Sequence, residues 1–132
     1  SKSYGNTISF SDTPETVRQK VMNMVTDPAR IRKTDPGHPE VCSVFAFHKV
    51  FSPEEVPEIE SACQNGEIGC VACKKKLAEK LLAFHQPIHE KRQTLIHKPA
   101  YLREVIESGS DRARVQAAAT LAEARRAMKV AP

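Results

Sequence analysis

The chain has 132 residues, enough for one domain with its own hydrophobic core but too few for a nucleotide-binding α/β domain as well. Apolar residues make up 40% of the sequence, yet no apolar run approaches the ~20 residues that a membrane-spanning helix needs. No signal peptide opens the chain, so we expect a cytoplasmic protein without a membrane partner. The net charge is only +4, and its distribution along the chain is more informative than its size.

The N-terminal third predicts one helix between two irregular segments. Residues 1–9 are polar and predict a loop. Asp12 can cap a helix and Pro14 suits its first turn, so we expect a helix that continues to about Thr26. Three prolines and a glycine in residues 27–39 predict an ordered but irregular loop.

The middle of the chain predicts two short helices and a turn. The first helix should run over residues 40–51. The sequence Ser52-Pro53-Glu54-Glu55 has the form of a capping box and should begin the second, with Ile59 and Cys63 facing inward. The two glycines of residues 65–69 should end it.

The last part predicts three more helices. A long helix should cover residues 70–97 with a kink at Pro87. Pro99 should begin the next helix, Gly109 should end it, and Ser110 should cap the last one. No segment alternates apolar and polar residues convincingly, so the predicted fold class is an all-α helical bundle with an irregular N-terminal loop.

Basic residues are concentrated in residues 74–103. Only Glu79 and Glu90 oppose them there, so this segment carries about +6 and the remainder is slightly acidic. The basic residues are Lys74, Lys75, Lys76, Lys80, Lys91, Arg92, Lys98 and Arg103. This concentration fits a polyanion partner, with a solvated helix face as the alternative. Three consecutive lysines at a helix start oppose the helix dipole, which favours a binding role for them.

Four cysteines are candidates for a metal site. Cys42, Cys63, Cys70 and Cys73 are separated by 20, 6 and 2 residues. Disulfides are not expected in the cytoplasm, which leaves a metal site or unrelated core cysteines. The C-x-x-C pair stands at a helix start, where the dipole favours thiolate over thiol. Four thiolates suit tetrahedral zinc or a [4Fe–4S] cluster.

His85 and His89 have the i, i+4 spacing of a metal-binding pair. No third ligand stands near them in the sequence, and His85 falls on the apolar stripe of its helix. We therefore expect a packed core histidine at position 85.

The first six residues, Ser1-Lys2-Ser3-Tyr4-Gly5-Asn6, place small residues around a lysine. They resemble the end of the KMSKS signature of class I aminoacyl-tRNA synthetases, without its first two residues. In that family the loop closes over ATP, and its lysine offsets charge that develops on the phosphates. The resemblance implies that Lys2 is catalytic and that Ser1, Lys2 and Ser3 bind ATP.

Spaced features along nearly the whole chain resemble tryptophanyl-tRNA synthetase. They are Val25-Thr26-Asp27, the loop from Arg30 to Pro39-Glu40-Val41-Cys42, Phe45 with His48-Lys49, Gly66 and Gly69 before Lys76-Leu77-Ala78, Pro87-Ile88, Glu90-Lys91-Arg92, and Ala117-Ala118-Ala119. The tyrosine enzyme is the near neighbour, and the assignment to tryptophan rests on this resemblance alone.

The resemblance implies the C-terminal portion of an ATP-dependent tryptophan–tRNA ligase. Residues 1–12 would be the tail of the ATP loop, and residues 13–132 a helical tRNA anticodon-binding domain. The implied partners are tRNA(Trp), together with tryptophan and ATP in the full-length enzyme, which we expect to be a homodimer. The first signature lysine and a HIGH-type motif are absent from this sequence, so we expect the chain alone to be inactive.

The cysteine pattern resembles that of the synthetases with a [4Fe–4S] cluster beside the anticodon-binding region. The resemblance implies Cys42, Cys63, Cys70 and Cys73 as ligands of one cluster, with zinc as the alternative metal. The residues expected to contact tRNA are Lys74, Lys75, Lys76, Arg30, Arg32 and Lys33. Two other interpretations remain: a stand-alone helical RNA-binding module with a structural metal, and an iron–sulfur redox or sensor protein.

Overall fold

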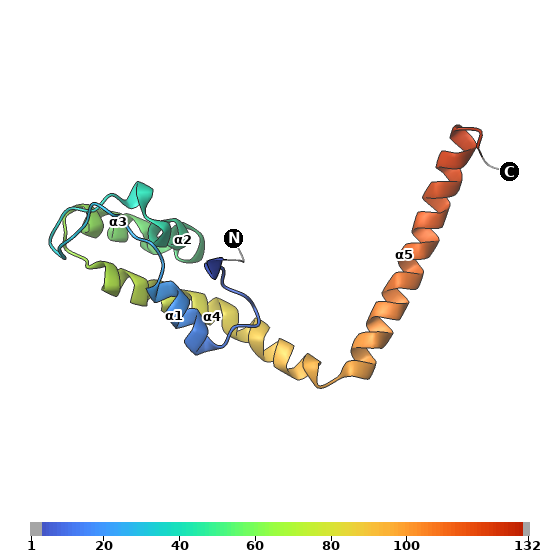
Figure 1. The fold of residues 1–132 in the computed structure, drawn as a ribbon, viewed down its shortest axis with the longest axis horizontal. Helices are drawn as coiled ribbons and strands as arrows, with labels where there is room; N and C mark the ends of the chain where they lie inside the picture. The colour runs from blue at the N-terminus through green and yellow to red at the C-terminus, as the bar shows by residue number, and fades with distance from the viewer. Residues whose placement is uncertain (1–3, 131–132) are drawn as a thin grey trace. The chain divides into compact units, whose positions relative to one another are not determined.

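The structure, a computed structural model, describes residues 4–130, and every regular element in that range is helical (Figure 1). The all-α prediction is therefore confirmed. The chain divides into two compact units, Ser1–Arg92 and Gln93–Pro132. Among the described residues, no helix is both long enough and apolar enough to cross a membrane.

Helix α1 (Pro14–Met22) begins one residue later than the sequence predicts. Its cap is Thr13, whose hydroxyl oxygen accepts a hydrogen bond from the backbone N–H of Thr16. Asp12 was the predicted cap, and this was wrong, because its carboxylate instead accepts bonds from Lys20 at 2.6 Å and from the Ser9 N–H at 2.8 Å. Asp12 therefore ties the preceding loop to α1.

The segment between α1 and α2 is irregular, as predicted, and is closed by Asp27. The carboxylate of Asp27 accepts bonds from the backbone N–H of Ala29 and from both the backbone and the ring Nδ1 of His38. The predicted helix over 40–51 is divided: the 3-10 turn η2 (Pro39–Val41) precedes α2 (Ser43–Phe51), and Cys42 lies between them.

The predicted capping box at Ser52 is absent. The Ser52 hydroxyl contacts the Nδ1 atom of His48 at 2.7 Å and makes no capping bond. The 3-10 turn η3 (Pro53–Glu55) intervenes before α3 (Val56–Gln64) begins. The serine is used here to satisfy a buried histidine, because an unpaired buried ring nitrogen is costly.

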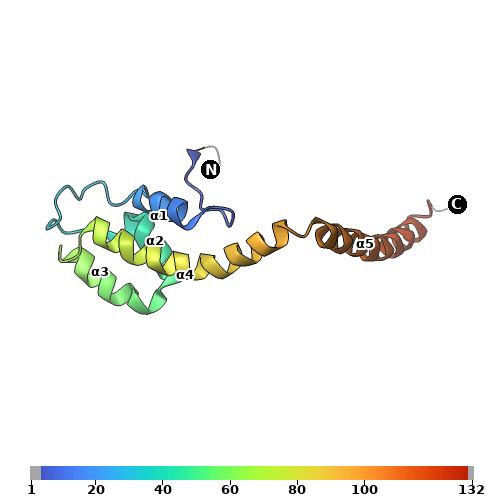
Figure 2. The same cartoon turned by 90° about the horizontal axis from the view of Figure 1, so that it is seen from below.

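Helices α1, α2 and the first half of α4 (Cys70–Ile96) form the core of the first unit. The buried cluster consists of Val17, Val21, Val44, Leu77, Ala78 and Leu81. Burying a side chain of the size of Leu77 contributes roughly 1.5–3 kcal/mol. Figure 2 shows this half of α4 running between α1 and α3. His85, on the same helix, is only 3% exposed, which confirms the prediction of a packed histidine.

The second unit contains the end of α4 and helix α5 (Pro99–Ala127). The two helices predicted here are one, because Gly109 lies inside α5 and does not end it. A glycine costs a helix interior only about 1 kcal/mol, which a run of good helix formers outweighs. No side chain within α5 is buried.

Candidate cysteine centre and nucleic-acid interface

The four cysteines lie at the ends of three helices. Cys42 directly precedes α2, Cys63 lies in the last turn of α3, and Cys70 and Cys73 belong to the first turn of α4. All four are free thiols of intermediate burial. The fold therefore brings together residues that are far apart in the sequence.

The turn between α3 and α4 folds back on itself. Gly66 has a φ of +70°, a left-handed conformation that glycine adopts without a Cβ penalty. After it, the backbone N–H groups of Glu67 and Ile68 both donate to the Ala62 carbonyl, at 2.8 and 3.1 Å. This reversal returns the chain from Cys63 to the start of α4.

The proline-rich loop (residues 27–39) packs closely against this turn at two glycines, Gly37 and Gly66. The Gly37 N–H donates to the Cys63 carbonyl at 2.9 Å, and a Cβ added at Gly37 would lie 2.5 Å from the Cys63 sulfur. A Cβ at Gly66 would overlap the Thr34 carbonyl. Side chains at these positions would separate the loop from the cysteines.

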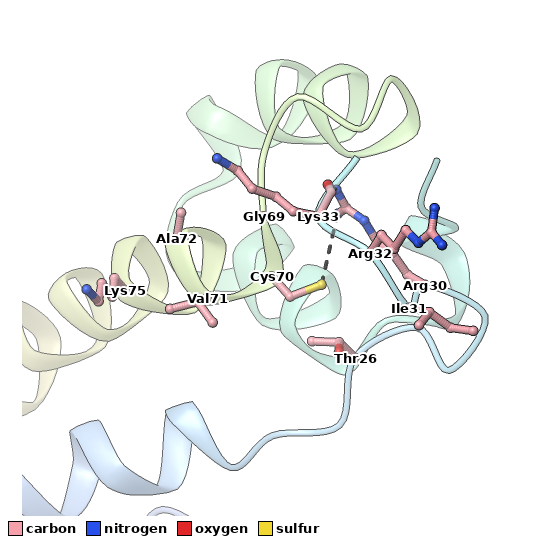
Figure 3. A pocket seen from close by; sticks show the side chains of 10 residues that line it. All are labelled: Thr26, Arg30, Ile31, Arg32, Lys33, Gly69, Cys70, Val71, Ala72 and Lys75. Atoms are coloured by element: carbon pink, nitrogen blue, oxygen red, sulfur yellow. Dashed lines mark hydrogen bonds between the residues drawn. The ribbon is translucent and has the colours of Figure 1, made fainter. Parts of the chain in front are cut away.

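Arg30 joins the loop to the cysteine centre. Its Nη2 donates to the carbonyl oxygens of Lys33 and Ile68, both at 2.6 Å. Its Nη1 lies 3.7 Å from the Cys63 sulfur and 3.9 Å from the Cys70 sulfur. The guanidinium thus bonds to the backbone of both segments and places positive charge beside two thiols, of which Figure 3 shows Cys70.

The thiols influence one another electrostatically. Burial, followed by the proximity of Cys42, Cys63 and Cys70, raises the pKa of the Cys73 thiol to about 12. Burial also raises the pKa of Cys63, and the positive charge of Arg30 opposes that effect. Without a counterion these groups therefore favour the neutral thiol.

His48, which the sequence analysis named only for the family resemblance, is also a member of this centre. It is fully buried, its Nε2 lies 3.5 Å from the Cys73 sulfur, and it donates to the Cys73 carbonyl at 3.3 Å. Burial lowers the pKa of His48. Its place on the apolar stripe of a short helix was the available signal, but the stripe does not reveal which group the ring meets.

The donor set has the chemistry of a soft metal centre. Thiols from three helix ends converge, and a guanidinium offsets the charge that thiolates would carry. Within residues 4–130, however, no group of three or more His, Cys, Asp or Glu side chains is arranged so that it could hold a metal ion.

A basic cavity opens beside the cysteine centre. It has a volume of about 530 Å³ and reaches from the loop after α1 to the first turns of α4 (Figure 3). Its lining is Thr26, Arg30, Ile31, Arg32, Lys33, Gly69, Cys70, Val71, Ala72 and Lys75. Cys70 and Arg30, which both line the cavity, thus connect the thiols with the basic lining. An anion in this cavity would meet several cationic side chains.

The structure separates the three consecutive lysines. Lys75 lines the cavity. Lys74 donates to the Met22 carbonyl at 2.8 Å, at the end of α1, and Lys76 lies 3.6 Å from the Glu58 carboxylate. Arg32 and Lys33, in the proline-rich loop, also line the cavity. The remaining predicted site residues, Ser1, Lys2 and Ser3, lie outside the described residues.

Comparison with known proteins shows which family this chain belongs to. The family model described as "tRNA synthetases class I (W and Y)" matches residues 1–86. The tryptophan–tRNA ligase of Aquifex aeolicus is 47% identical over 98% of this chain, which covers 33% of that protein. The ligase of Thermotoga maritima is 41% identical over 98% of the chain, which covers 40% of that relative. The chain thus spans about a third of the length of these relatives.

Solved structures are also similar. Tryptophanyl-tRNA synthetase from Campylobacter jejuni superposes with a TM-score of 0.78 and 28% identity, covering 98% of this chain and 41% of that one. The same enzyme complexed with ADP and tryptophan gives a TM-score of 0.78. The similarity extends over both units, each of which is helical in this chain.

Proposed function

This chain belongs to the class I tRNA synthetases of the tryptophan and tyrosine type, and we propose that it is the C-terminal portion of a tryptophan–tRNA ligase. The observation that carries this proposal is the 47% identity to a tryptophan–tRNA ligase over 98% of the chain. It also favours tryptophan over tyrosine. The complete protein would use ATP to join tryptophan to tRNA(Trp), in the cytoplasm and as a homodimer.

Within that protein we assign residues 1–12 to the tail of the ATP loop and residues 13–132 to tRNA binding. Ser1, Lys2 and Ser3 would contact the ATP phosphates, and Lys2 would offset the charge that develops on them. Support comes from the family match, which includes these residues. Catalysis needs this lysine close to the α-phosphate, so the loop must be held in place from its C-terminal side.

For the tRNA we propose an interface around the basic cavity. Arg32, Lys33 and Lys75 line it and would neutralise phosphates of the anticodon stem-loop. Lys74, Lys76 and Arg30 would support this surface indirectly, because their charged groups contact protein atoms. Single-stranded bases in the same cavity would provide sequence selection.

For the cysteines we propose that Cys42, Cys63, Cys70 and Cys73 hold one [4Fe–4S] cluster, with zinc as the alternative. Support comes from the mutual proximity of the thiols and from Arg30, whose charge would stabilise the thiolate forms of Cys63 and Cys70 beside it. When bound, the group would supply cross-links between three helix ends, in addition to any redox chemistry. It would also hold Cys70 at the edge of the basic cavity.

The experiment for the ligase function is aminoacylation by the complete protein. We expect tryptophan, and not tyrosine, to be attached to tRNA(Trp) in an ATP-dependent reaction. If the protein attaches tyrosine instead, it would be a tyrosine–tRNA ligase of the same family. Absence of any attachment, with salt-dependent RNA binding retained, would favour a stand-alone RNA-binding module.

The experiment for the cysteine centre is metal analysis after anaerobic purification. We expect about four iron atoms per chain and a broad absorption band near 400 nm, both lost when Cys70 is replaced by serine. One zinc per chain would identify the alternative metal. If the protein holds neither iron nor zinc, before and after reconstitution with each metal, the four cysteines are core residues and not metal ligands.

A further inference from the structure

A short segment ties the N-terminal loop to helix α4. The carbonyl oxygen of Ser9 accepts two hydrogen bonds, one from the backbone N–H of Asp12 at 3.0 Å and one from the ring Nε2 of His85 at 3.2 Å. The Ser9 N–H donates to the carboxylate of Asp12, which also binds Lys20 of α1. Residues 9–12 therefore form a turn that is fixed to both helices.

The His85 ring is held rigidly at this point. It is 3% exposed and stacks on Phe10, with 6.3 Å between ring centroids, and on His89, with 5.4 Å between centroids. Because a carbonyl can only accept, the Nε2 atom of His85 must carry a hydrogen and donate it to Ser9. The imidazole thus offers Ser9 a donor whose direction cannot change.

Packing alone does not account for an imidazole at this position. The Nδ1 atom of His85 is buried and has no hydrogen-bond partner in the described structure. Such a nitrogen costs about 1–3 kcal/mol, which a leucine of similar size would avoid. The compensating gain that the structure offers is the bond from Nε2 to Ser9.

We propose that His85 is a positioning residue for the ATP loop. It fixes Ser9, and the seven residue steps from Ser9 back to Lys2 reach at most roughly 25 Å when fully extended. The anchor therefore fixes the point from which the chain leads back to Lys2, and it couples the loop to the helix that begins at the cysteine centre. This inference rests on the proposed ligase function, because it assigns a catalytic role to Lys2.

The test uses two substitutions in the complete protein. In His85→Phe, the ring stack and the burial are retained but the donor is lost. In His85→Gln, the side-chain amide can restore a donor near the position of Nε2. We measure tryptophan-dependent pyrophosphate exchange, the KM for tryptophan, and the thermal midpoint of each variant.

We expect His85→Phe to lower the kcat of exchange roughly 5- to 10-fold, because Ser9 and the loop before it lose an anchor worth about one hydrogen bond, with KM for tryptophan changed less than 2-fold. His85→Gln should retain at least about a third of the wild-type rate. Wild-type kinetics in His85→Phe would overturn the proposal. Equal loss of rate and of thermal midpoint in both variants would also overturn it, by showing a packing role only.

A second measurement separates this inference from the ligase function. In the 132-residue chain, we expect the amides of Ser9 and Asp12 to exchange hydrogen at least several-fold faster in His85→Phe than in wild type. If the wild-type complete protein shows no tryptophan-dependent pyrophosphate exchange, the ligase proposal fails but the anchor does not. Unchanged amide exchange in His85→Phe would defeat the anchor, whatever the enzyme does.

Discussion

At the scale of single residues, the three consecutive lysines after Cys73 are chemically identical but structurally different. Lys75 lines the basic cavity, whereas Lys74 donates to the Met22 carbonyl. A lysine that already satisfies a backbone carbonyl releases few counterions when RNA binds. The three positions therefore cannot contribute equally to the salt dependence of binding.

We predict that Lys75→Ala flattens the slope of log affinity for tRNA against log salt by roughly 0.7–0.9, the value for one lost phosphate contact. Lys74→Ala is the matched control and should change that slope by much less, while lowering the thermal midpoint. Filter binding at several salt concentrations provides the slopes. Equal slopes for both variants would place the RNA elsewhere.

Asp27 provides a prediction about pH. The hydrogen bond from the His38 ring, followed by that from the Ala29 N–H, lowers the pKa of Asp27 below 3.8. A carboxyl with a lowered folded-state pKa stabilises the fold above its unfolded pKa, and this contribution is lost as pH falls through the folded value. Asp27→Asn should therefore lower the thermal midpoint by a few degrees at pH 7.

The difference in thermal midpoint between wild type and Asp27→Asn should shrink steadily below about pH 4, because the Asp27 carboxyl then becomes protonated and loses its charge. Thermal melts of both proteins between pH 7 and pH 3 measure it. A difference that is the same at every pH would mean that the charge of Asp27 is irrelevant to stability.

At the scale of elements, the turn between α3 and α4 and the middle of α5 use glycine in opposite ways. Gly66 has a φ of +70° and lies against Thr34, whereas Gly109 is helical with open space around its Cα. Only the first position requires the absence of a side chain.

We predict that Gly66→Ala lowers the free energy of unfolding by about 1–2 kcal/mol or more, through left-handed strain and the clash with Thr34. Gly109→Ala should instead stabilise α5 by about 0.5–1 kcal/mol. Urea unfolding followed by circular dichroism compares the two. If both variants were equally stable, the claim that position 66 requires a residue without a side chain would be wrong.

At the scale of the whole molecule, this chain covers only 33% of the Aquifex aeolicus ligase and 40% of the Thermotoga maritima ligase. The described residues of this chain contain no strand that could form a nucleotide-binding sheet, and Lys2 is the one lysine to which we assign a role at the ATP phosphates. Transition-state charge on the phosphates needs more donors than one lysine.

We predict that the purified 132-residue chain does not form tryptophanyl-adenylate. The measurement is tryptophan-dependent pyrophosphate exchange, with the complete protein as the positive control. Clear exchange by the chain above the level without tryptophan would contradict the division of labour proposed for residues 1–12 and 13–132.

Local signals predicted much of the secondary structure. The 3.6-residue periodicity and the prolines predicted helices near their observed positions, and the glycines at 66 and 69 predicted the turn. Errors arose where a local signal had a competing partner. Asp12 pairs with Lys20 instead of capping α1, and Ser52 bonds to His48 instead of capping α3. The side-chain oxygens of capping residues can accept hydrogen bonds from other groups, and local sequence does not show which partner they take.

The sequence by itself determined the helical class, the cysteine spacing and the family resemblance, because periodicity and residue type are properties of the chain alone. Only the tertiary structure decided that Arg30 contacts two thiols, that Lys75 and not Lys74 lines the cavity, and that His85 donates to Ser9. Those contacts join residues 33 to 76 positions apart. Their geometry depends on how helices pack, and no local pattern encodes that packing.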